Sequence, residues 1–186
     1  GEYALATTPV HFNFGPGRNV SSNVHSHSGL TDFATSLQHL SAELPDCGSV
    51  SLVVSWFGND LRCGQCELRP KVEQTSHDGI GMPWRAGGIV RSAAQTIPQV
   101  DNRPIYGGTP CDASVIEAIA AIRASGKEVM FYPFILMDQL SGNLLPDPWS
   151  GAVGQPALPW RGRITTSIAA GQAGTPDGTA TAAAEV

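Results

Sequence analysis

Polar side chains that follow two apolar segments are the residues best suited to chemistry in this sequence. Asn59 and Asp60 follow the apolar segment 49–54, and Asp138 follows segment 128–135. Parallel strands end at one edge of a sheet, where ligands bind, so these groups are expected to lie close together. Two carboxyl groups that flank a glycosidic bond can act as acid and as base or nucleophile. Asp60 and Asp138 are therefore candidate catalytic residues.

A structural role is the alternative for both carboxylates. Asp60 is two residues from Arg62 in the sequence and could form an ion pair with it. Either aspartate could also accept hydrogen bonds from backbone amides of its own loop.

Aromatic residues in the loops after these segments suggest carbohydrate contact. The C–H faces of a sugar stack on aromatic rings, and its hydroxyls need amide or charged partners. The loops 57–108 and 136–162 also hold Trp84, Tyr106 and Trp160, which could instead close apolar gaps. The residues expected to contact a glycan are Trp56, Asn59, Asp60, Arg62, Asp138 and Trp149.

Cys63 and Cys66 have the spacing of half a zinc site. The missing ligands would have to come from Cys47, Cys111 or a histidine, because the sequence has no second CxxC motif. The simpler interpretation is a set of small thiols and a loop pair that could oxidise. No metal and no other cofactor is predicted.

Apolar periodicity predicts the elements that position these residues. Leucine and phenylalanine recur at helical spacing between an N-cap at Thr31 and Pro45. A second helix is predicted from an N-cap at Thr109, through Pro110, to a C-terminal Gly126. Two buried strands and the helix between them indicate parallel neighbours in an α/β fold with long loops at the carboxyl ends.

Weaker patterns predict four further elements. Segment 10–14 alternates as a strand does, and segment 163–168 could form a short strand. A short helix is expected from Ile89 to Ala94, and the Ala/Thr-rich segment 179–186 resembles the start of a helix.

Composition limits the classes of function. The chain has 186 residues, of which 41% are hydrophobic, enough for a sizeable core. A net charge of −5 and the lack of a Lys/Arg cluster argue against nucleic-acid binding. The sequence has neither an apolar run long enough to span a bilayer nor a secretory signal pattern.

Three strings, residues 47–64, 103–110 and 132–138, resemble a known family. They are similar to the TIM-barrel-like domain of the large tail-tip (host-specificity) protein of gene transfer agents and related tailed phages. The resemblance implies a glycoside-hydrolase-like (β/α) barrel within a baseplate protein of a phage-like particle, assembled in the bacterial cytoplasm. It also implies recognition or cleavage of cell-envelope glycan, contacts with other tail or baseplate proteins, and a place for Tyr132 among the glycan-binding residues.

The resemblance also implies how the chain is divided. Residues 1–28 would be a connector and loop, and residues 29–186 the first part of a barrel, because a full barrel needs about 250 residues. The catalytic carboxylates of the family would then lie beyond Val186, and this stretch alone would be inactive. The alternative is a non-catalytic carbohydrate-binding or structural baseplate module.

Overall fold

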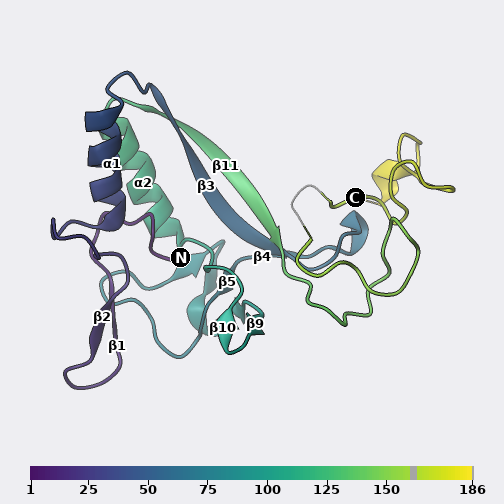
Figure 1. Ribbon diagram of the computed structural model, residues 1–186, viewed down its shortest axis with the longest axis horizontal. Coiled ribbons are helices and arrows are strands. Elements are labelled where there is room, and N and C mark those ends of the chain that lie inside the picture. The colour runs from purple at the N-terminus through teal and green to yellow at the C-terminus, as the bar shows by residue number, and fades with distance from the viewer. Residues whose placement is uncertain (160–162, 186) are drawn as a thin grey trace. The chain divides into compact units, whose positions relative to one another are not determined.

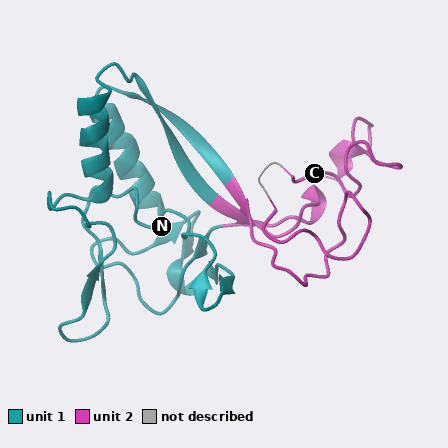
Figure 2. Cartoon of the chain, viewed as in Figure 1, with its two compact units in different colours: residues 1–55, 70–134 teal, residues 56–69, 135–186 magenta. Residues whose placement is uncertain are grey.

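The computed structural model describes residues 1–159 and 163–185 (Figure 1). The chain divides into two compact units, which Figure 2 shows in different colours. The first unit comprises residues 1–55 and 70–134, and the second comprises residues 56–69 and 135–186.

The two helices predicted from strong apolar periodicity are present in the first unit. Helix α1 spans Asp32–Glu43, and the side chain of its N-cap Thr31 accepts a hydrogen bond from the Ala34 amide. Helix α2 spans Asp112–Ala124. Gly126, at φ 79°, follows α2 in the left-handed conformation that ends many helices.

The N-cap predicted for the second helix is wrong. Cys111 holds that position without a side-chain cap, and its amide donates to the Glu2 carbonyl. The Thr109 hydroxyl instead accepts a hydrogen bond from the Lys71 amide at 3.1 Å. Tertiary contacts with residues far away in the sequence therefore delay the start of the helix by two positions.

The longest strands are β3 (Ser49–Gly58) and β11 (Glu128–Met137). They form a three-stranded sheet with β4 (Leu68–Arg69), in the order β11-β3-β4. The Glu128 amide donates to the Gly48 carbonyl, and the Asp138 amide donates to the Gly58 carbonyl. The residue numbers increase together along β3 and β11, as they do in a parallel pair. Strand β4 is antiparallel to β3.

The predicted (β/α) barrel is wrong. Apart from the β11-β3-β4 sheet, the described residues form small two-stranded sheets, mostly antiparallel, and only two α-helices. A barrel repeats the strand–helix unit eight times, whereas here the unit occurs once, between β3 and β11. Turns such as Asp101-Asn102, both with positive φ, fold the long loop into hairpins instead of helices.

The described residues of the first unit also contain four pairs of short strands. The antiparallel pairs are β1 (His11–Asn13) with β2 (Asn19–Ser21), β6 (Arg85–Ala86) with β7 (Ile89–Val90), and β9 (Gln99–Val100) with β10 (Arg103–Pro104). The pair β5 (Lys71–Val72) and β8 (Gln95–Thr96) is parallel.

Two predicted helices are replaced by other structure, and one predicted strand is reduced to a single bridge. Residues 89–94 form β7 followed by a 3₁₀ turn at Arg91–Ala93. The Ala/Thr-rich end forms only a 3₁₀ turn, Ala182–Ala184. In segment 163–168, Thr165 makes an isolated bridge to Arg62. A further 3₁₀ turn covers Cys63–Gln65.

The main core of the first unit lies where residues 1–10, the β5–β7 region and the start of α2 meet. Its buried members are Tyr3, Ala6, Val10, Val72, Met82, Trp84, Ala86 and Cys111. In β3, buried Leu52 and Val54 alternate with exposed Ser51 and Val53, so one face of this strand remains open. No helix among the described residues is long and apolar enough to cross a membrane.

Candidate functional site

Asp60 lies at the end of β3 in the second unit, where the sequence predicted a site. Its side chain is buried, and the residue is only 3% exposed. One carboxylate oxygen accepts hydrogen bonds from the Arg62 amide at 2.8 Å and from Arg62 Nε at 3.0 Å. The other oxygen accepts from Arg62 Nη2 at 2.7 Å, which completes a two-pronged ion pair.

Gln155 ties this ion pair to the loop that follows β11. Its Nε2 donates to Asp60 Oδ1 at 2.8 Å and to the Pro146 carbonyl at 2.9 Å. Its Oε1 accepts from the Leu61 amide at 3.0 Å and from Gln139 Nε2 at 2.9 Å. The Asp60 carboxylate therefore connects segments of the second unit that lie far apart in the sequence.

The surroundings of Asp60 keep it ionised. Burial acts to raise the Asp60 pKa, but the hydrogen bonds from Arg62 and Gln155 outweigh burial, and the pKa lies below its ordinary value. A carboxyl group that donates a proton in catalysis needs the opposite shift. This geometry matches the ion-pair alternative and does not suit a proton donor.

The other predicted residues of the second unit have differing surroundings. Asp138 is buried, and its amide bonds to Gly58. Asn59 is exposed, and its side-chain oxygen accepts from the Glu67 amide at 2.8 Å. Trp56 and Trp149 are half-buried, and the Arg163 guanidinium lies 5.8 Å from the Trp149 ring centroid. Trp160 lies outside the described residues.

Cys63 and Cys66 lie at a tight turn in the second unit. The Cys63 thiol donates to the Glu185 carbonyl at 3.5 Å, and Cys66 Sγ packs against Gly58. Across the described ranges, no group of three or more His, Cys, Asp or Glu side chains is placed to hold a metal ion.

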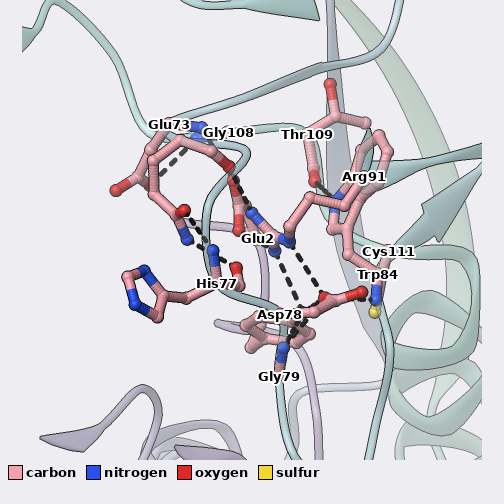
Figure 3. A network of polar contacts seen from close by, with 12 residues as sticks. Glu2, Glu73, His77, Asp78, Gly79, Trp84, Arg91, Gly108, Thr109 and Cys111 are labelled. Atoms are coloured by element: carbon pink, nitrogen blue, oxygen red, sulfur yellow. Dashed lines mark hydrogen bonds and ion pairs between the residues drawn. The ribbon is translucent and has the colours of Figure 1, made fainter. Parts of the chain in front are cut away.

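Sequence reasoning missed a polar network in the first unit, centred on Arg91 (Figure 3). Arg91 is 2% exposed and forms ion pairs with Glu2 and Asp78. Its guanidinium also donates to the Gln74 carbonyl at 2.8 Å and to the Tyr3 hydroxyl at 3.0 Å. The same group lies within 6 Å of three ring centroids, those of Tyr3, Phe12 and Trp84.

Each charged group of the network has an oppositely charged partner. Glu2 Oε1 accepts from the Glu73 amide at 2.7 Å while Oε2 pairs with Arg91. Burial raises the Tyr3 pKa, so its hydroxyl stays protonated. Burial also acts to raise the Asp78 pKa, but bonds from Trp84, Arg91 and Gly79 hold it below its ordinary value. These contacts fasten residues 1–3 to the hairpins, which is a structural role.

No local sequence pattern could have revealed the Arg91 network. Arg91 lies in a segment predicted as a short helix within a long loop, and its partners are up to 89 positions away. Trp84, one of the aromatic residues of that loop, is 1% exposed and donates from Nε1 to the Thr109 carbonyl at 2.8 Å. Its burial in the core matches the alternative given for these aromatic residues, a ring that closes an apolar gap.

Exposed aromatic side chains lie on β11, within the first unit. Phe131 is 51% exposed and Tyr132 is 42% exposed. Tyr132 and Phe134 are two residues apart on one strand, so they share a face, and their ring centroids are 6.1 Å apart at 44°. Pro133, which lacks an amide hydrogen, is compatible with β11 because the strand lies at the sheet edge.

Comparison of the chain with protein-family models and with curated proteins finds no match.

Proposed function

We propose that this chain is a glycan-recognising module of a tail or baseplate protein in a phage-like particle. The place in a tail rests on the resemblance of three residue strings to the tail-tip family. Glycan recognition rests chiefly on one observation, the face of β11 that presents exposed Tyr132 beside half-buried Phe134. The proposed partners are cell-envelope glycan and neighbouring tail proteins.

The Tyr132–Phe134 pair suits a glycan because aromatic rings offer flat apolar surfaces for the C–H faces of sugars. Two rings on one strand face can contact successive sugar units of a chain. The Tyr132 hydroxyl adds a hydrogen-bonding group at the edge of that surface.

The geometry favours recognition of the glycan without its cleavage. Of the two carboxylates considered for catalysis, Asp60 has both oxygens engaged by Arg62 and Gln155. Its lowered pKa leaves it without the proton that a general acid must donate. We therefore assign Asp60 to holding the loops of the second unit together.

Cosedimentation with insoluble peptidoglycan tests this function. The wild-type protein is expected to pellet with the glycan, and Tyr132→Ala to stay largely in solution. Phe131→Ala is the matched control, because Phe131 is also an exposed aromatic residue but projects from the opposite side of β11. Equal pelleting of all three proteins, or none by the wild type, would contradict the proposed function.

A reducing-end assay on the same samples separates recognition from cleavage. The proposal predicts no release of reducing ends above the level of a protein-free control. Release that disappears in Asp60→Asn or Asp138→Asn would instead establish a glycoside hydrolase.

A further inference from the structure

The turn that contains Cys63 and Cys66 has a backbone geometry that allows a disulfide bond between them. The Cys66 amide donates to the Cys63 carbonyl at 3.3 Å, and the Gln65 amide donates to Arg62 at 2.9 Å. The ends of such a hydrogen-bonded turn have Cα atoms less than about 7 Å apart. Disulfides join Cα atoms about 4.4–6.8 Å apart, so this turn brings both cysteines within bridging range.

The Cys63 thiol would have to leave one weak contact to form the bond. Cys63 Sγ contacts the Glu185 carbonyl at 3.5 Å, a weak hydrogen bond that a rotation of the side chain breaks. Both cysteines are half-buried, so a small thiol reagent can approach them.

Cys47 and Cys111 are poorer candidates for a disulfide bond. Cys111 is fully buried, with its sulfur 3.4 Å from Met82 Sδ in the core of the first unit. Cys47 also belongs to the first unit, where its thiol donates to the Ser49 carbonyl at 3.4 Å. Only Cys63 and Cys66, among the four cysteines, share one turn.

We propose that Cys63 and Cys66 form a reversible disulfide by exchange with a small disulfide such as oxidised glutathione. One cysteine thiolate attacks a glutathione sulfur, the glutathione S–S bond breaks, and one reduced glutathione leaves. The second thiolate then attacks the mixed disulfide, closes the Cys63–Cys66 bond and releases the second glutathione. The two protein thiols are oxidised, one glutathione disulfide is reduced to two thiols, and the protons pass to those thiols.

The Cys63–Cys66 disulfide would lie in the loop between β3 and β4. That loop carries Asp60 and Arg62. Its Cys63 amide donates a hydrogen bond to the Thr165 carbonyl at 2.7 Å. Oxidation exchanges the contact between Cys63 and Glu185 for a covalent closure of the turn. This inference is independent of glycan binding and rests on the geometry of the turn alone.

A glutathione titration of the folded protein tests the inference. The folded protein is equilibrated with reduced and oxidised glutathione in varied ratio, quenched with acid, alkylated in denaturant so that buried Cys111 also reacts, and measured by intact mass and peptide mapping. The expected result is a species with two unalkylated cysteines, mapped to Cys63 and Cys66, that returns to four alkylated cysteines after reduction.

Two variants make the outcome specific. Cys66→Ser should convert the product to a mixed disulfide between Cys63 and glutathione, because the resolving thiol is gone. Cys47→Ser should leave the wild-type result unchanged. Four alkylated cysteines at every ratio, a lasting mixed disulfide at Cys63 in the wild type, or a bond that includes Cys47 would overturn the inference.

Discussion

At the scale of single residues, the pairing of buried charges decides what each group can do. Asp60 and Arg62 are close in the sequence, so their ion pair could be foreseen as one of two alternatives. Glu2 and Arg91 are far apart, and nothing local marks either as buried. Sequence therefore predicts short-range pairs better than pairs that only the tertiary fold assembles.

Loss of the Arg91 side chain should destabilise the first unit strongly. Arg91→Ala leaves the Glu2 carboxylate buried without its cation, and breaking such a pair costs about 3–5 kcal/mol of unfolding free energy. Urea unfolding followed by circular dichroism measures this loss. Exposed Arg103→Ala is the control and should change stability by less than about 0.5 kcal/mol.

A second substitution tests whether the charge is the cause. Adding Glu2→Gln to Arg91→Ala removes the unpaired carboxylate and should recover part of the lost stability. An Arg91→Ala protein as stable as the wild type would show that the network is dispensable.

Asp60 should make stability depend on pH in the acid range. Its folded-state pKa lies below the ordinary value, so ionised Asp60 stabilises the fold above the unfolded-state pKa of about 4. That contribution is lost as the pH falls through the folded-state pKa. Asp60→Asn should therefore be less stable at pH 7, by about 1–3 kcal/mol, and lose less on acidification.

Urea midpoints at several pH values, for the wild type and for Asp60→Asn, measure this dependence. Exposed Asp46→Asn serves as the control and should follow the wild-type curve. Parallel acid curves for the wild type and Asp60→Asn would mean that the ion pair with Arg62 contributes nothing to stability.

At the scale of elements, strong apolar periodicity predicts the long helices and strands, but it does not predict how often the strand–helix unit repeats. The two helices and the two long strands have apolar patterns of adequate length, and the structure confirms their presence. The barrel is implied only by the resemblance of three residue strings, whereas the apolar pattern itself predicts one strand–helix–strand unit. Strands of two residues have no measurable period, so the hairpins of the loop 61–108 could not be predicted.

Gly58, the last residue of β3, should not tolerate a side chain. A methyl group there would lie 3.0 Å from both Cys66 Sγ and Met137 Sδ, and 3.3 Å from Ile135 Cγ2. Such overpacking costs about 1–3 kcal/mol, so Gly58→Ala should lower the thermal midpoint. Gly48→Ala, with no heavy atom within 4 Å of the new methyl group, should not lower it. Equal midpoints for the two variants would refute this packing.

At the scale of the whole molecule, each of the two units carries its own set of predicted residues. The second unit holds Asp60, Arg62, Asp138 and Trp149, while Tyr132 belongs to the first. The residue pattern at the strand ends predicts that Asp60 and Asp138 lie close together at one site. The structure instead gives a closed ion pair in one unit and an open aromatic strand face in the other. Burial, which sequence alone did not reveal, makes this difference.

The central claim, that the β11 face recognises glycan, is tested most directly by calorimetric titration with soluble peptidoglycan fragments of increasing length. The wild type should bind, and more tightly to fragments long enough to cover both Tyr132 and Phe134. Tyr132→Ala should lose about tenfold in affinity, as expected for a ring contact of about 1.4 kcal/mol, while Phe131→Ala should bind as the wild type does. Absence of binding by the wild type, or equal affinity in Tyr132→Ala, would contradict the claim.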